Sequence, residues 1–250
     1  MINRMYRNYG KRCFDLLMAV PALVVLSPLV AVVALVVRFR LGSPVIFRQA
    51  RAGLHGRTFT IFKFRSMTDA KDEHGFPLPD SVRLTSLGRF LRASSLDELP
   101  QLWNVIRGDM SLIGPRPQLA EYLEHYTPEQ ARRHEVHPGL TGWAQVNGRN
   151  TISWEQKFHY DVWYVDHLNG WLDLRILAMT VRRLLARHDV SAEGHATMPR
   201  YKGPIELAYS QNGVHHHLET APAARRSTAT SLTLPLAKRG APGKSRAEAG

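Results

Sequence analysis

Two adjacent carboxylates, Asp97 and Glu98, stand within residues 95–100, and their chemistry suits phosphoryl transfer. A carboxylate can attack phosphorus as a nucleophile or bind Mg²⁺, and the free N–H groups of a helix N-terminus attract phosphate. The same residues suit an ordinary helix start, because Ser95 and Glu98 match a capping box and acids there complement the helix dipole. The local pattern leaves both interpretations open.

Two cationic segments are candidates for binding phosphate. Arg116 stands between Pro115 and Pro117, which hold it in a stiff, non-helical segment, and a guanidinium can bind a phosphate through two hydrogen bonds. Lys63 belongs to the alternating run Lys63-Phe64-Arg65, whose cations can face phosphates or lipid head groups. The alternative for Arg116 is a proline turn with a solvated arginine. The alternative for Lys63 is a solvated strand edge.

Two later segments carry further candidates for ligand recognition. The glycine-rich stretch 138–150 permits close backbone approach to a ligand, and its Arg149 is a candidate contact to a diphosphate. The aromatic helix expected over 158–166 suits a membrane interface, and its Asp161 is a candidate second acid of the site. The alternative for this helix is an amphipathic core helix with exposed acids.

The elements that must position these residues follow from turn signals and periodicity. Residues 45–47 and 58–62 are rich in aromatic and β-branched side chains and predict the two strands of a small hairpin. Residues 95–106 predict a helix that has Pro100 in its first turn and ends at Gly108. Further helices are predicted over 86–92, 119–126, 128–136, 154–165 and 171–187.

An uncharged stretch, residues 16–37, is long enough to cross a bilayer core of ~30 Å as a helix. Ser27-Pro28 lies near its middle, and an interior proline kinks or breaks a helix. Both flanks are basic, with Lys11-Arg12 before the stretch and Arg38 after it, so both ends favour the cytoplasm. A helix that enters the bilayer, breaks at Ser27-Pro28 and returns fits these features, and a kinked transmembrane helix is the alternative.

Composition narrows the classes of partner. The formal charge of +12 suits nucleic acid, an anionic membrane face or phosphate-bearing substrates. The single cysteine, Cys13, excludes an internal disulfide framework and a cysteine-based zinc site. The sequence also lacks a Walker loop and a strand–GxGxxG–helix pattern. From about Gln211 onward the chain is rich in Ala, Ser, Thr, Pro and basic residues without a period, which indicates a disordered tail.

Taken together, these motifs resemble the bacterial sugar transferase family, in its short form of monotopic polyprenyl-phosphate phosphoglycosyl transferases. The resemblance covers about residues 8–204 and consists of many long motifs in a fixed order, so chance is a poor explanation. The matching segments are Lys11-Arg12-Cys13-Phe14-Asp15, Leu26-Ser27-Pro28-Leu29, Gly42-Ser43-Pro44-Val45, 63–67, 95–105, 108–117, 138–150 and Asp161-Val162-Trp163-Tyr164-Val165.

The resemblance implies a reaction and roles for the site residues. Asp97 resembles the nucleophile that attacks the β-phosphate of a UDP-sugar, with Mg²⁺ bound near it and Glu98 as its dyad partner. UMP leaves, and a polyprenyl (undecaprenyl) phosphate takes the phospho-sugar from Asp97, as the first membrane step of glycan assembly. Arg116 resembles a phosphate-binding arginine. The other residues expected around the site are Lys63, Arg92, Arg149 and Asp161.

The resemblance also implies a mainly helical α+β fold with a small β-hairpin and a re-entrant membrane helix broken at Ser27-Pro28. The expected division is an N-terminal segment 1–10, a re-entrant membrane helix 11–41, a catalytic domain 42–205 and a disordered basic tail 206–250. The expected location is monotopic in the bacterial inner membrane, with the catalytic domain facing the cytoplasm. Expected partners are the UDP-sugar, polyprenyl phosphate and inner-membrane lipids, with a homo-oligomer left open and no nucleic acid.

Two further expectations concern the donor and the rival function. Residues 190–195 resemble the end of the short, initiating members of the family, which favours an N-acetylated or amino-deoxy sugar as donor. The rival from another class is a non-enzymatic basic membrane protein that acts as a scaffold in a polysaccharide assembly complex.

Overall fold

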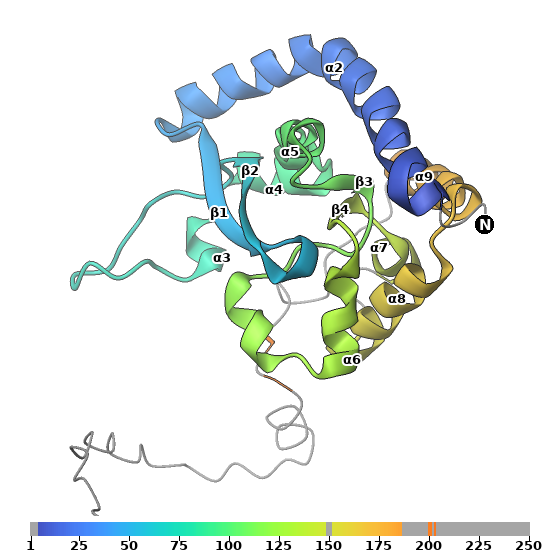
Figure 1. Ribbon diagram of the computed structural model, residues 1–250. Helices are drawn as coiled ribbons and strands as arrows, with labels where there is room; N and C mark the ends of the chain where they lie inside the picture. Colours follow the sequence, from blue (N-terminus) through green and yellow to red (C-terminus); the bar gives the residue numbers. More distant parts are fainter. Residues whose placement is uncertain (1–4, 149–151, 187–199, 202, 204–250) are drawn as a thin grey trace, which may run out of the picture. The chain divides into compact units, whose positions relative to one another are not determined.

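The computed structural model describes residues 5–148, 152–186, 200, 201 and 203, and it shows a mainly helical α+β fold (Figure 1). Short 3-10 or π helices carry the label η. In chain order the described elements are η1 (Tyr6–Gly10), α2 (Lys11–Leu41), β1 (Ile46–Ala52), η2 (Leu54–Gly56), β2 (Thr58–Phe64), α3 (Asp80–Arg83), α4 (Ser86–Ala93), η3 (Leu96–Glu98), α5 (Gln101–Arg107), β3 (Ser111–Ile113), η4 (Ala120–His125), α6 (Pro128–Ala131), η5 (Arg132–Glu135), β4 (Gly139–Thr141), α7 (Trp143–Asn147), α8 (Trp154–His167) and α9 (Gly170–Leu185).

The predicted hairpin is confirmed. β1 and β2 pair antiparallel from Ile46 opposite Phe64 to Ala52 opposite Thr58, so β1 is longer than predicted. The extra residues of β1 are largely polar, and pairing with β2 keeps them extended against their weak strand propensity. Asn104 of α5 fastens β2 from the side, since it accepts from Phe62 N at 3.1 Å and donates to the Thr60 carbonyl at 2.8 Å. This attachment fixes the end of β2, which carries Lys63.

The main core joins α2, α5, β3, α8 and α9. Its buried members include Ala19, Val105, Ile113, Tyr164 and Ile176, one from each of these elements. Burial of apolar side chains from elements far apart in the sequence is the main force that holds them together. The core therefore lies directly under β3, which leads into the segment of Arg116.

The glycines of the stretch 138–150 serve a close approach within the fold. β3 and β4 pair in parallel, and a Cβ on Gly139 would lie 2.1 Å from the Gly114 nitrogen. A Cβ on Gly142 would lie 2.1 Å from the Gly114 oxygen. These two glycines let β4 lie against the segment that leads to Arg116, and their approach to a ligand stays a prediction.

Helix α2 runs as one helix through Pro21 and Pro28, and Figure 1 shows it as a curved helix. A helix-break-helix with an interruption at Ser27-Pro28 was expected, whereas the helix continues there. Pro28 has no N–H to donate to the Val24 carbonyl four residues earlier, and the Ser27 hydroxyl donates to that carbonyl at 2.8 Å instead. The re-entrant path through a bilayer stays a prediction.

The helical stretch Tyr6–Leu41 is the one described helix that is long and apolar enough to cross a membrane. Only 11% of its most apolar window is buried in the protein. Its exposed large apolar side chains include Leu17, Val24, Val25, Val32 and Leu35. A long apolar surface of this kind indicates contact with lipid or with another protein.

The first turns of α2 are fastened to the domain by buried polar contacts. Asp15 accepts hydrogen bonds from Ser111 Oγ at 2.9 Å and from Leu112 N at 3.1 Å. Lys11 Nζ lies 3.1 Å from Asp15 Oδ1 and 3.0 Å from Asp173 Oδ2. The two carboxylates are 3% and 0% exposed, so their ionic partners are needed to make burial tolerable. These contacts attach the base of α2 to both β3 and α9.

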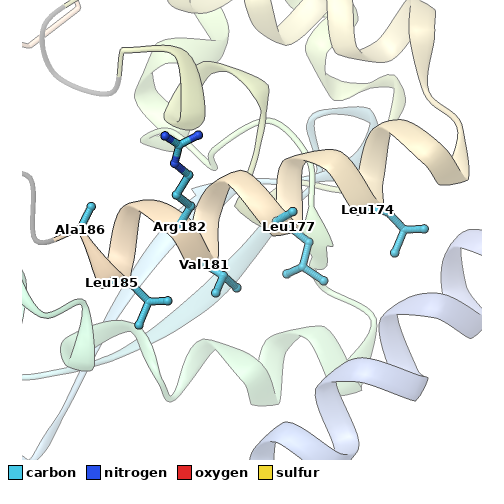
Figure 2. A pocket seen from close by; sticks show the side chains of 7 residues that line it. Leu174, Leu177, Val181, Arg182, Leu185 and Ala186 are labelled. Atoms are coloured by element: carbon cyan, nitrogen blue, oxygen red, sulfur yellow. The ribbon is translucent and has the colours of Figure 1, made fainter.

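Helix α9 confirms the predicted amphipathic pattern. One side enters the core through Leu172 and Ile176, whereas an apolar stripe on the outside lines a shallow pocket. Figure 2 shows Leu174, Val181 and Leu185 along this stripe, with the Arg182 side chain directed away from it. The stripe adds a second exposed apolar surface to that of α2.

Candidate active site

Three segments bring Lys63, Glu98 and Arg116 together. Lys63 lies on β2, Glu98 on η3, and Arg116 in the proline-flanked segment after β3. Lys63 Nζ lies 2.7 Å from Glu98 Oε1, and Arg116 Nη2 lies 2.5 Å from the same oxygen. Arg116 Nη1 also donates to Glu98 Oε2 at 3.4 Å. We call Lys63, Glu98 and Arg116 the ion cluster.

The capping box predicted for Ser95 and Glu98 is wrong. Ser95 has a left-handed backbone, with φ 57° and ψ 16°, and its side chain makes no capping hydrogen bond. The Glu98 side chain is engaged in the ion cluster, and α5 begins only after Pro100. A left-handed backbone at a non-glycine residue costs on the order of 1–3 kcal/mol and clusters at functional sites. The structure therefore removes the capping-box explanation of the carboxylate pair, whereas both acids still lie in the first turn of η3. The predicted end of this helix at Gly108 is confirmed.

Asp97 is buried and differs from Glu98 in its surroundings. The residue is 7% exposed, and within the described ranges no hydrogen bond or ion pair reaches its carboxylate. Burial raises the pKa of Asp97 and Glu98 adds to the rise, whereas Lys63, Arg116 and Arg92 oppose it. A carboxylate with little solvation and no internal partner is available to attack phosphorus or to bind a metal ion.

Glu98 stays ionised in this setting. Burial raises its pKa, but Arg116 and Lys63 lower it by more, so the net pKa lies well below the ordinary value. In return, Glu98 raises the pKa of Arg116 against the effect of burial. Burial lowers the pKa of Lys63 although Glu98 opposes that shift. A carboxylate held by two cations is suited to orient them rather than to take up a proton.

Arg92 is close enough to Asp97 for its charge to act on that carboxylate. It belongs to α4, its Nε donates to Ser66 Oγ at 3.0 Å, and its charge lowers the pKa of Asp97. Helix α4 lies directly against the segment after β2, because a Cβ on Gly88 would be 1.8 Å from the Ser66 carbonyl oxygen. This close packing fixes α4, and with it Arg92, against the segment after β2.

Asp161 and Arg149 stand apart from this arrangement. Asp161 is buried on α8 and lies 2.7 Å from Arg133 Nη2 through its Oδ2. A direct contact of Asp161 with substrate stays a prediction. Arg149 and the donor-related segment 190–195 lie outside the described residues.

Two further cations near Arg116 were missed by the sequence analysis. Arg133 Nη2 donates to the Arg116 carbonyl at 2.8 Å. Burial and then repulsion by Arg116 lower the pKa of Arg51 to about 10. Arg133 follows Arg132 in the sequence, and such a pair is typical of a solvated helix face. The sequence pattern therefore does not indicate that Arg133 is buried.

Of the carboxylate pair, Asp97 could bind Mg²⁺ together with a substrate, because Glu98 is already paired with Lys63 and Arg116. In the part of the chain that the structure describes, no group of three or more His, Cys, Asp or Glu side chains is arranged to hold a metal ion. Mg²⁺ commonly takes one or two carboxylates and completes its coordination with substrate phosphates and water. Asp97 can supply such a carboxylate, so the available ligands suit a Mg²⁺ that is held jointly with a diphosphate.

The chain is similar to several known proteins. Residues 6–187 match the family described as bacterial sugar transferase. The uncharacterized sugar transferase EpsL of Bacillus subtilis (strain 168) is 55% identical over 198 residues, which are 79% of this chain and 98% of EpsL. The UDP-glucose:undecaprenyl-phosphate glucose-1-phosphate transferase of Xanthomonas campestris pv. campestris is 43% identical over 194 residues, 73% of this chain and 40% of that protein. The undecaprenyl-phosphate galactose phosphotransferase of Salmonella typhimurium is 39% identical over 197 residues, 72% of this chain and 41% of that protein.

Proposed function

The chain belongs to the bacterial sugar transferase family, and we propose that it transfers a sugar 1-phosphate from a UDP-sugar to undecaprenyl phosphate, with release of UMP. The names of two relatives describe transfer of this kind with glucose and with galactose. The observation that carries the proposal is the buried Asp97 carboxylate beside the ion cluster. A nucleophile next to fixed cations is the arrangement that transfer of a phosphoryl group requires.

Asp97 is the proposed nucleophile. One of its oxygens attacks the sugar-bearing phosphorus of the UDP-sugar, and the bond from that phosphorus to the bridging oxygen breaks. UMP leaves with the electron pair of that bond, and the phospho-sugar stays on Asp97 as an acyl phosphate. A phosphate oxygen of undecaprenyl phosphate then attacks the same phosphorus and displaces the Asp97 carboxylate. A covalent intermediate divides one difficult transfer into two easier ones.

The ion cluster stabilises the negative charge on the phosphoryl group while it is transferred. Arg116 and Lys63 are held in place by Glu98 before substrate arrives, so they need little rearrangement during the reaction. Arg92 adds positive potential at Asp97, and Arg149 is proposed as a further phosphate contact. Mg²⁺, held by Asp97 and the diphosphate, would supply additional neutralisation of phosphate charge.

Membrane association is part of the proposal. The apolar surface of α2 and the outer stripe of α9 are both exposed, and they suit a bilayer as their common environment. The basic residues at both ends of α2 favour a path on which both ends stay at the cytoplasmic face. A site at this interface meets a soluble nucleotide sugar and a lipid phosphate without moving either across the membrane.

A UMP-release assay tests the reaction. Purified protein in micelles is given undecaprenyl phosphate, Mg²⁺ and each of several UDP-sugars, and the same assay is run with Asp97→Asn. We expect release with at least one donor from the wild type and loss of release in Asp97→Asn. Asp166→Asn is the matched control, because that acid is exposed and its partner, Arg132, is not a member of the ion cluster. Equal release from wild type and Asp97→Asn would refute the assignment.

A labelling experiment tests the membrane path. Cys13→Ser removes the single cysteine, and new cysteines are then placed one at a time at residues 2 and 205. We expect both positions to react with a membrane-impermeant reagent from the same side. Reaction from opposite sides would show that α2 spans the bilayer.

The rival scaffold function would leave Asp97→Asn fully able to support polysaccharide assembly.

A further inference from the structure

Arg133 is fully buried and binds three separate parts of the chain. Its side chain is 1% exposed and its Nε and Nη2 donate to Asp161 Oδ2 at 3.1 and 2.7 Å. Its Nη1 donates to the Tyr126 hydroxyl at 3.1 Å, and its Nη2 donates to the Arg116 carbonyl at 2.8 Å. A guanidinium has five N–H groups in a fixed fork, and this one uses them to join α8, the end of η4 and the segment of Arg116.

The segment of Arg116 depends on such outside donors. Proline has no N–H, so two of the three residues from Pro115 to Pro117 cannot donate a backbone hydrogen bond. Their carbonyls are instead held from outside, since Gly139 N donates to Pro115 at 2.9 Å and Arg51 Nη1 donates to Pro117 at 3.5 Å. The bond from Arg133 to the middle carbonyl is the shortest of the three, and it belongs to the residue whose side chain holds Glu98.

Asp161 makes this buried guanidinium tolerable. An unpaired charge in the interior is costly, and Arg133 lies beside a second cation, Arg116. Asp161 neutralises Arg133 and accepts two of its N–H groups. The aromatic rings of Tyr126 and Phe158 close the space around the guanidinium at 5.7 and 5.4 Å. These partners leave Arg133 in one orientation, aimed at the Arg116 carbonyl.

We infer that Arg133 and Asp161 are positioning residues that act through the main chain of Arg116, and that neither binds the substrate. The inference rests on the proposed function, because it assigns these residues to the same site. It gives Asp161 a role other than the substrate contact expected from the sequence. Once Arg116 has lost its side chain, the precision of its backbone no longer matters for the reaction. The effects of substitutions at Arg133 and Arg116 should therefore not add.

A double-mutant cycle on UMP release tests this dependence. The four proteins are the wild type, Arg133→Lys, Arg116→Ala and the combination of both. Lysine keeps a cation for Asp161 but cannot reach Asp161, Tyr126 and the Arg116 carbonyl together. We expect Arg133→Lys to slow UMP release by about 10–100-fold in the wild-type background, the usual size of a loss from about 1 Å of misplacement. In the Arg116→Ala background we expect a further loss below about threefold.

Two additional variants guard against a simple loss of folding. Arg132→Lys alters the neighbouring arginine, whose partners Glu129, Glu135 and Asp166 are exposed or half-buried, and it should leave UMP release unchanged. Asp161→Asn keeps an oxygen that accepts from Arg133, and it takes the place of Arg133→Lys if that protein fails to melt cooperatively. Thermal melting of every variant shows which of them are folded.

The outcomes separate the two levels of the proposal. An active wild type in which the two losses simply add would overturn the positioning role, because a direct substrate contact is independent of the Arg116 side chain. An active wild type that tolerates both Arg133→Lys and Asp161→Asn would overturn it as well. A wild type without UMP release from any UDP-sugar would refute the proposed function and the positioning role with it.

Discussion

Replacement of Glu98 by glutamine is expected to change the pH dependence of the reaction. Burial and then Glu98 raise the pKa of Asp97, so removal of the Glu98 charge lowers that pKa. Lys63 and Arg116, released from Glu98, act in the same direction. The acid limb of UMP release should therefore move to lower pH.

The same substitution should lower stability while it favours ionisation of Asp97. Lys63 is 19% exposed and loses its carboxylate partner, whereas Arg116 at 39% is more solvated and loses less. Breaking a buried pair on one side costs ~3–5 kcal/mol, so about 3 kcal/mol of unfolding free energy is expected here. The assays are UMP release from pH 4 to 8 and denaturant unfolding in micelles, with Asp166→Asn as control. An acid limb that stays in place or moves to higher pH would refute this account of the Asp97 carboxyl group.

Three further predictions concern other parts of the molecule. Burial and Arg133 lower the pKa of His134 to about 4, so protonation favours the unfolded chain as the pH falls from 6.5 to 4. Over that range the wild type should lose about 3 kcal/mol more unfolding free energy than His134→Leu, and an equal pH dependence of unfolding in the two proteins would contradict this. Gly88→Ala should lower the unfolding free energy by at least about 2 kcal/mol and reduce UMP release, because the new Cβ would lie 1.8 Å from the Ser66 carbonyl oxygen. A stable and active variant would show that α4 can shift to make room for the methyl group. Ser27→Ala should destabilise α2 by ~1 kcal/mol, because the Val24 carbonyl loses the hydrogen bond that the Ser27 hydroxyl donates. An unchanged melting temperature in micelles would mean that another group donates to this carbonyl instead.

The hairpin and most helices could be predicted from the sequence because their signals are local. Strand propensity and a turn identify the hairpin, and periodicity identifies α4, α8 and α9. The capping box failed for a related reason, since Ser95 and Glu98 have the right types and spacing. Glu98 instead satisfies two cations that are 35 and 18 residues away, and a local pattern contains no information about them.

The candidate site shows the same division between local and distant information. Arg116 could be singled out because the prolines on either side are its neighbours in sequence. Arg133 could not, because its burial depends on Asp161, which is 28 residues later. The helix α2 was expected to break at Pro28, and the bond from Ser27 that replaces the lost one is local but depends on a single rotamer. The glycines 139 and 142 indicated close approach correctly, whereas the partner, Gly114, became visible only in the structure.

The attachment at the base of α2 has a mechanical consequence. Asp15 accepts hydrogen bonds from the backbone of Leu112 and from the hydroxyl of Ser111, and Arg116 follows only four residues after Leu112. The other end of α2 is attached as well, because Val33 and Val37 are buried against Phe64 and Leu91. A movement of α2 relative to the domain would therefore disturb contacts at both of its ends, those of Asp15 with β3 and those of Val37 with the cluster that includes Phe64 and Leu91. The apolar helix and the segment that leads to Arg116 are thus held together as one packed unit.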